Sequence, residues 1–133
     1  MSWSNTLESA ALTWLLGNYT IYVGYGTASA GEDGSGLSEP SGGGYARELY
    51  GSGTVANSGN DYYIENDSDI VFDTATSNQG TISHVYFFSH LTSTDAAYFL
   101  GEVSFSELGL DDISLITGGH IEIAAGDCLI RLD

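Results

Sequence analysis

Hydrophobic residues recur every three or four positions near the start of the chain and every second position along much of the remainder. Between Thr6 and Leu16 the apolar residues fall on one helical face, with Asn5 as a cap, Glu8 at the third position and Gly17 at the end. A helix this short is marginal alone, so its apolar stripe must dock against a sheet or a neighbouring subunit. The stripe comprises Leu7, Ala10, Ala11, Trp14 and Leu15, and Trp14 is the expected anchor.

Alternation of apolar with polar or small residues predicts a series of short strands. Between Tyr19 and Tyr25 it is typical of a strand with one buried face. The segment from Ile82 to Phe88 becomes apolar on both faces, which predicts a central strand covered on both sides. Further strand candidates are Tyr45–Tyr50, Tyr62–Ile64, Ile70–Phe72, Tyr98–Phe105, Ile113–Ile116, His120–Ala124 and Cys128–Leu132, the last two joined by a hairpin turn at Ala125, Gly126 and Asp127.

Short strands divided by Gly, Asn, Asp and Ser, with one helix at the start, predict an all-β fold. We expect an antiparallel, jelly-roll-like β-sandwich with a short N-terminal α-helix, rather than a βαβ arrangement. At 133 residues the chain is expected to form one domain, residues 1–133. Within it, residues 1–17 hold the helix and residues 26–44 form a long Gly-rich surface loop.

The segment from Glu39 to Arg47, Glu-Pro-Ser-Gly-Gly-Gly-Tyr-Ala-Arg, concentrates the rarest residues of the chain. It holds the only proline, Pro40, and one of only two arginines in a chain without lysine. The fixed φ of Pro40 and the freedom of three consecutive glycines predict a shaped turn that leads Tyr45 into a strand. Arg47 is expected to form a bidentate ion pair with Glu39 that holds the loop against the strand.

This segment resembles the Glu-x-Ser-Gly-Gly-x-Tyr-Ala-Arg signature of a family of small structural proteins of tailed viruses, labelled head decoration, minor tail or tail-fibre proteins. Most of the chain follows the family's layout, although Pro40 stands where a β-branched residue is usual and Glu48 where an uncharged amide is common. The resemblance implies a virion protein, assembled in the host cytoplasm, that contacts copies of itself and major capsid or tail proteins. The expected structural or interface residues are Glu39, Gly42, Gly43, Tyr45, Arg47 and Trp14.

The charge of the chain limits the environments and binding partners that we expect for it. Aspartate and glutamate number 18 against two arginines, a formal net charge of -16. Such self-repulsion, without any lysine, suggests high ambient salt, as for a halophilic or haloarchaeal virus, because the Debye length falls to about 3 Å at 1 M. An ordinary acidic surface or a strongly basic partner would also account for it. Two arginines cannot make a basic patch, so direct binding to nucleic acid is not expected.

No motif for a membrane segment or a disulfide is present. No apolar run is long enough to span a bilayer, and residues 1–17 lack the basic region of a secretory signal, so we expect a soluble chain. Cys128 is the single cysteine and cannot form an internal disulfide. Its place in a hydrophobic run indicates a small core residue.

The ionisable side chains give no catalytic pattern. His84, His90 and His120 show no nucleophile, zinc-ligand or phosphate-loop spacing, so neither an enzyme nor a cofactor is expected. We expect His84 to be satisfied within a sheet and the other two to face solvent at strand ends. One acidic cluster is a candidate Ca²⁺ site, weighed against a solvated turn: Asp61, Glu65, Asp67 and Asp69, with Asp73 beyond them.

The preferred hypothesis is a non-enzymatic structural protein of a tailed-virus particle. Its first form is a capsid decoration, cement or turret-type protein that assembles as a symmetric oligomer. The alternative is a minor tail, baseplate or tail-fibre component with a receptor- or glycan-binding role, in which Trp3, Tyr62 and Tyr63 would stack on sugar rings.

Overall fold

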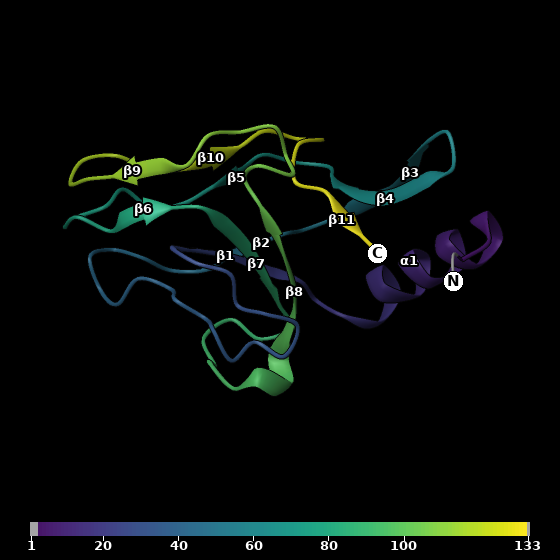
Figure 1. Ribbon diagram of the computed structural model, residues 1–133, viewed down its shortest axis with the longest axis horizontal. Coiled ribbons are helices and arrows are strands. Elements are labelled where there is room, and N and C mark those ends of the chain that lie inside the picture. The colour runs from purple at the N-terminus through teal and green to yellow at the C-terminus, as the bar shows by residue number, and fades with distance from the viewer. Residues whose placement is uncertain (1–2, 133) are drawn as a thin grey trace.

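The computed structural model describes residues 3–132 as a mostly β structure with one α-helix at its start (Figure 1). The helix α1 spans Asn5–Asn18, and a single 3-10 turn, η1, spans Ala96–Tyr98. The strands are β1 Tyr22–Gly26, β2 Glu48–Leu49, β3 Gly53–Ser58, β4 Asp61–Asn66, β5 Ile70–Val71, β6 Gly80–Ile82, β7 His84–Phe88, β8 Phe99–Ser104, β9 Ile113–Leu115, β10 Glu122–Ile123 and β11 Ile130–Arg131.

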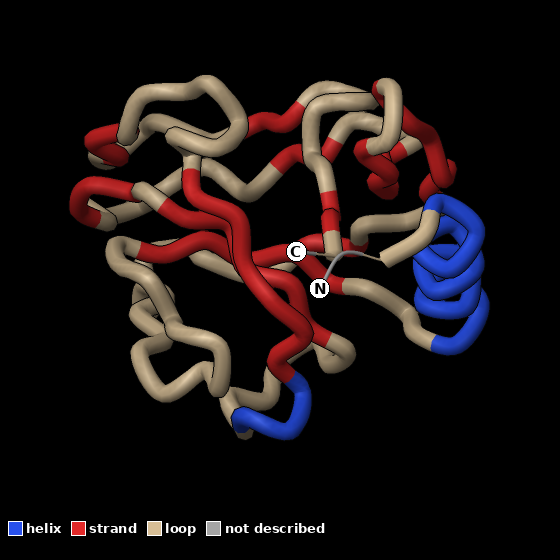
Figure 2. Tube along the Cα trace, turned by 45° about the vertical axis from the view of Figure 1, so that its right-hand side comes forward, coloured by secondary structure: helices blue, strands red, loops and turns tan. Residues whose placement is uncertain are grey.

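These strands form four small antiparallel sheets. The largest has the order β2-β1-β7-β8, the next β11-β4-β3, and the pairs β10-β5 and β6-β9 complete the set. The strands and the loops between them surround the core, while α1 lies along one side at one end of the long axis (Figures 1 and 2). The all-β fold with a short N-terminal helix, predicted as an antiparallel sandwich, is confirmed.

The pair β1–β7 is the centre of the fold, because both of its faces are covered. Its register runs from Tyr22 opposite Phe88 to Gly26 opposite His84. One face joins the main core, and the other joins a second cluster of Ala30, Tyr86 and Phe88. A central strand near Phe88 is therefore confirmed, although the segment is divided at Ser83 into β6 and β7, which belong to different sheets.

The main core draws on α1 and all four sheets. Its buried residues are Leu12, Ile21, Val23, Tyr25, Tyr50, Ile64, Ile70, Phe72, Ala75, Ile82, Val85, Phe87, Val103, Phe105, Leu115, Ile121, Ile123 and Cys128. Burial on this scale is the main favourable term in folding, since each fully buried aliphatic or aromatic side chain contributes about 1.5–3 kcal/mol.

The helix begins and packs differently from the prediction. Ser4, not Asn5, is the N-cap, and its hydroxyl accepts a hydrogen bond from the N–H of Leu7 at 3.2 Å. Trp14 does not anchor the helix, because 58% of it is exposed, whereas Leu12 is fully buried. The helix contacts β3 and β4 through the face that carries Leu12, and Leu15 of the predicted stripe also packs against the core. The other large members of that stripe, Leu7 and Trp14, are exposed. Both faces are apolar, so hydrophobic spacing alone could not distinguish them.

The turn at Ala125, Gly126 and Asp127 does not form the predicted hairpin. The strand before it, β10, pairs with β5, and the strand after it, β11, pairs with β4. Asn66, which is buried, holds the turn: its amide donates to the carbonyl of Ala124 at 3.1 Å, and its side-chain oxygen accepts from the N–H of Cys128 at 2.9 Å. A side chain distant in sequence therefore takes the place of hairpin pairing.

Cys128 is a core residue, as predicted. It is fully buried, and burial raises the pKa of its thiol to about 12. The hydroxyl of Tyr50 donates to its carbonyl oxygen at 2.6 Å. Neither helix within residues 3–132 has the length and apolar character needed to cross a bilayer.

Candidate functional site

Arg47 forms the most connected polar contact in the molecule, and its guanidinium is nearly removed from water. Its Nε donates to Glu39 Oε2 at 3.0 Å and its Nη2 to Glu39 Oε1 at 2.6 Å, the bidentate pair expected from the sequence. The side chains of Arg47 and Glu39 are 3% and 10% exposed. Nη1 donates to the carbonyls of His90 and Ser93 at 2.8 and 2.9 Å. The guanidinium carbon lies 3.4 Å from the centre of the Phe88 ring.

Tyr45 completes this group, which we call the Glu39–Tyr45–Arg47 node. Its hydroxyl donates to Glu39 Oε2 and accepts from the N–H of Tyr25 at 3.3 Å. Burial, followed by the hydrogen bond to Glu39 and the charge of that carboxylate, raises the pKa of Tyr45 well above its ordinary value. Tyr45 therefore stays protonated and keeps donating. Gly24 makes room for the node, because a Cβ there would overlap the Tyr45 hydroxyl and lie 3.0 Å from Glu39 Oε2.

The glycine turn brings Tyr45 back to the Glu39 carboxylate. Gly42, Gly43 and Gly44 have φ of 73°, 65° and 81°, a left-handed run that strongly favours glycine. The carbonyl of Gly43 accepts from the amide of Gln79 at 2.8 Å and from the N–H of Thr76 at 2.9 Å. The two predicted glycines are thus held against the segment before β6.

The loop of residues 27–44 contains no helix or strand and closes over Tyr86. The Tyr86 hydroxyl donates to the carbonyl of Ala28 at 2.5 Å and lies 3.1 Å from Ser38 Oγ. The carboxylate of Glu102 holds the other side of the loop, accepting from Ser29 Oγ at 2.5 Å and from the N–H of Ala30 at 2.8 Å. Side chains from β7 and β8 therefore fix a loop that has no backbone ladder of its own.

The chemistry of the node is structural. Each hydrogen bond that Arg47 donates ends on a carboxylate or a carbonyl, and Glu39 accepts from both Arg47 and Tyr45. Its one hydroxyl, that of Tyr45, is bonded to both the Glu39 carboxylate and the N–H of Tyr25. A buried pair of this kind offers little net stabilisation over an apolar substitute, but loss of one partner leaves an uncompensated buried charge.

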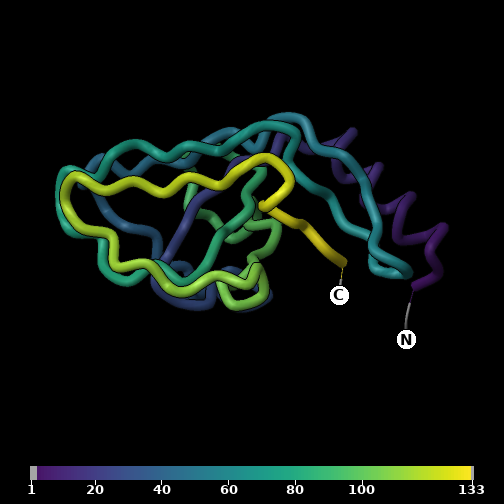
Figure 3. Tube along the Cα trace, turned by 90° about the horizontal axis from the view of Figure 1, so that it is seen from above, coloured from purple at the N-terminus to yellow at the C-terminus, as the bar shows by residue number. Residues whose placement is uncertain are grey.

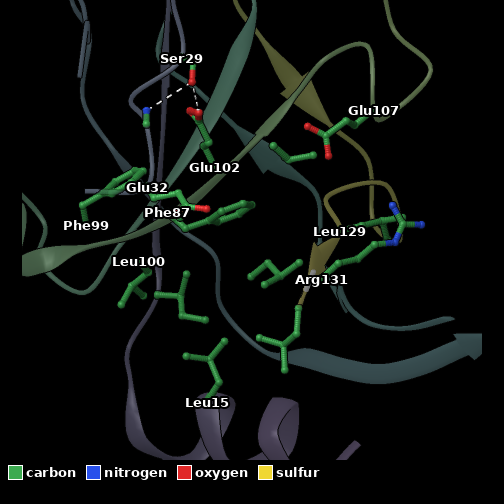
Figure 4. Close-up of a pocket in the computed structure, with 16 residues that line it drawn as sticks. Leu15, Ser29, Glu32, Phe87, Phe99, Leu100, Glu102, Glu107, Leu129 and Arg131 are labelled. Atoms are coloured by element: carbon green, nitrogen blue, oxygen red, sulfur yellow. Dashed lines mark hydrogen bonds between the residues drawn. The ribbon is translucent and has the colours of Figure 1, made fainter. Parts of the chain in front are cut away.

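The second feature is a recess of about 560 Å³ between β8, the C-terminal strand β11 and the end of α1. Figure 4 shows Phe87, Phe99 and Leu100 on one side, Leu15 from the helix below, and Leu129 and Arg131 on the other side. The carboxylates of Glu32, Glu102 and Glu107 also line it. It is therefore an apolar hollow with acidic groups around it.

Most polar groups of the recess already have partners in the chain. Glu102 is bound to Ser29 and Ala30, and Glu107 accepts from Ser104 Oγ at 3.1 Å. The Arg131 guanidinium lies 3.2 Å from the Asp61 carboxylate, and both side chains are partly exposed. What the recess offers a ligand is chiefly apolar and aromatic surface.

The structure does not bring the acidic calcium candidates together. Within residues 3–132 no group of three or more His, Cys, Asp or Glu side chains is arranged to hold a metal ion. Asp61 faces Arg131, Asp67 accepts from Thr54 Oγ1 at 2.6 Å, and Asp69 accepts from the N–H of Ala125 at 2.9 Å.

The three histidines lie apart and serve local turns or sheets. His84 lies in β7, where its Nδ1 is 2.7 Å from Ser83 Oγ, as expected for a satisfied sheet residue. His90 is not simply turned to solvent: it is half-buried, and its Nδ1 accepts from the N–H of Ser93 at 2.9 Å. This turn directs the carbonyls of His90 and Ser93 toward Arg47. His120 is exposed and lies 3.6 Å from Glu122.

Several features were missed from the sequence. Trp3 is exposed, but Tyr62 and Tyr63, which were expected to stack on sugar rings with it, are each partly buried in β4. The recess, the contact of Phe88 with Arg47 and the role of Gln79 were not foreseen. All three join segments distant in sequence, and no local pattern encodes them.

Comparison with known proteins identifies a family that covers most of the chain. Residues 2–127 match a family model described as "Podophage GP4 fiber I protein gp80". No curated protein and no solved structure matches the chain.

The two arginines provide a matched test of the node. Arg47→Met should lower the free energy of unfolding by about 3–5 kcal/mol, because it leaves the Glu39 carboxylate buried without its cation. Arg131→Met should cost about 0–1 kcal/mol, since its pair with Asp61 is partly exposed. Denaturant unfolding measures both, and amide hydrogen exchange should rise in residues 28–44 only for Arg47→Met. Equal losses at the two positions would contradict a special role for the node.

Proposed function

The chain belongs to the family of the podophage GP4 fiber I protein gp80, and on that basis we propose that it is a structural subunit of a tail fibre. Membership makes it a structural component of a tailed-phage particle. The family description favours the tail-fibre alternative over the capsid decoration role that the sequence analysis placed first. The match, which extends over residues 2–127, is the observation on which the proposal rests.

The geometry is compatible with a building role. The node and the glycine turn fix long loops through buried hydrogen bonds, so the chain can present irregular surfaces without losing their shape. Within residues 3–132 the three histidines and Cys128 do not converge on a common site, and the thiol is buried. We therefore propose a protein that acts through contacts with copies of itself and with other virion proteins, without catalysis.

Labelling of purified particles tests the position. Gold-conjugated antibody against this chain should mark the tail, and quantitative mass spectrometry should give far fewer copies than of the major capsid protein. An antibody against the major capsid protein provides the control for access to the shell. Label spread evenly over the head, with copy numbers close to those of the major capsid protein, would instead support the capsid decoration role.

Receptor or glycan binding is a second role, and the recess supports it. Phe99 and Leu100, both partly exposed, offer apolar surface in a hollow of about 560 Å³, with carboxylates around it that can accept hydrogen bonds from hydroxyls. This differs from the site expected from sequence, in which Trp3, Tyr62 and Tyr63 would stack on the sugar.

A glycan array with two variants tests this role. Gly101 lines the recess and a Cβ there meets no atom within 4 Å, so Gly101→Trp should fill the hollow without moving the backbone. We expect wild-type protein to retain a restricted set of glycans, Gly101→Trp to lose them, and Ile116→Trp, at an exposed residue outside the recess, to keep them. An array without retained glycans, or retention by Gly101→Trp, would reject the recess as a receptor site.

We further propose that the protein works at high ionic strength. The net charge of -16 is the supporting observation, because exposed carboxylates repel one another and salt screens that repulsion. Asp111 and Asp112 are neighbouring exposed acids on a loop, so their mutual repulsion adds to this cost.

Thermal unfolding at two salt concentrations tests the proposal. Raising NaCl from about 0.1 M to about 1 M, where the Debye length falls from about 10 to about 3 Å, should raise Tm. The increase should be smaller in the double variant Asp111→Asn, Asp112→Asn, which carries two fewer charges. A Tm that does not change with salt in either protein would remove ionic strength from the account.

A further inference from the structure

Helix α1 carries two apolar faces, and only one of them is used within the chain. Leu12 is fully buried in the main core, and Leu15 and Leu16 pack against that core. At about 100° per residue, Leu7, Ala10 and Trp14 fall on the side opposite Leu12. We call these three residues, with Tyr19 just beyond the helix, the outer stripe.

The outer stripe exposes large side chains to solvent. Leu7 is 51% exposed, Trp14 58% and Tyr19 40%. The Trp14 and Tyr19 rings meet edge to face, with centroids 5.8 Å apart, so they form a continuous surface. Trp3, which is 45% exposed, lies just before the helix. Trp and Tyr are the residues that most often carry the energy of protein interfaces.

The distribution of acidic residues indicates which kind of partner would bind the outer stripe. Helix α1 has one acid, Glu8, in 14 residues, whereas the whole chain has 18 in 133. Of the two strands that the helix contacts, β3 has no acid, and β4 has Glu65 and Asp61, the latter paired with Arg131. A basic partner would be drawn to the acidic remainder of the surface. A second copy, which also carries a net charge of -16, meets the least repulsion where both surfaces lack carboxylates.

We propose that the outer stripe of α1 is the surface through which copies of this chain associate, helix against helix about a symmetry axis. The same stripe on each copy provides a self-complementary contact. The helix lies at one end of the long axis (Figures 1 and 3), so contact there leaves the opposite end, with β6 and β9, open to other partners. This inference deepens the proposed fibre role by identifying its self-assembly surface.

The size of the stripe sets the expected strength. Large aromatic side chains carry about 150–250 Å² each, so the half-exposed residues of the stripe, with Trp3, present roughly 400 Å². A stable interface needs about 800 Å² from each partner. The polar residues that flank the stripe and the edge of β3 must supply the remainder. We therefore expect association in the micromolar range in solution, strengthened by repetition in a particle.

Sedimentation velocity over a range of protein concentrations tests the proposal, in about 1 M NaCl to screen general repulsion. Wild-type protein should shift from monomer to a defined oligomer as concentration rises. Trp14→Glu should sediment as monomer throughout, with unchanged circular dichroism and Tm. Ile116→Glu adds the same charge at an equally exposed hydrophobic residue next to β9, and it should associate like wild type.

A second variant covers the case in which Trp14→Glu fails to fold. Ala10→Glu places a carboxylate in the same stripe at an exposed helical position of high intrinsic propensity, and it should also remain monomeric. A wild-type protein that stays monomeric at all concentrations would overturn the proposal. Association of folded Trp14→Glu or Ala10→Glu to the wild-type extent would also overturn it. Neither result depends on where particles are labelled, so the fibre assignment stands or falls separately.

Discussion

One buried ion pair organises the irregular half of this molecule. In a chain with 18 acids and two arginines, Arg47 is withdrawn from solvent and held by Glu39, two carbonyls and the Phe88 ring. It joins the loop before β2 to the loop after β7, segments that no backbone ladder connects. A lysine could provide one point charge but not this fork of donors, so the geometry requires arginine.

The residues around the node provide the space, the chain reversal and the hydrogen bonds that it requires. Gly24 leaves space for the Tyr45 hydroxyl, and the left-handed glycines allow the chain to reverse between Glu39 and Tyr45. The amide of Gln79 gives the carbonyls of Gly42 and Gly43 a second donor, beside the N–H groups of Tyr45 and Thr76. The loop gains a small core of its own around Tyr86, on the face of β7 away from the main core. Loop and strand thus stabilise each other across the sheet.

How far the sequence predicted this structure depended on how local each signal was. Alternation located β1 and the central β7, and the conjunction of Pro40, the glycines and Arg47 led to the node.

Tertiary contacts decided the other features. The two apolar faces of α1 compete equally in the sequence, and only packing on β3 and β4 selects Leu12 over Trp14. β3 was missed because its Gly, Thr and Asn residues resemble a linker until β4 pairs with it. The recess is formed by residues from five separate segments, so no single stretch of the sequence predicts it.

The burial of Cys128 has a practical side. The residue is fully buried, and burial raises the pKa of its thiol to about 12, so the thiol is shielded from solvent and poorly ionised at neutral pH. In an oxidising environment this buried thiol would therefore not form disulfide bonds between neighbouring subunits. A cysteine introduced on the outside would be the sole thiol open to maleimide dyes. The purified chain can thus be tagged at a single site without first replacing Cys128.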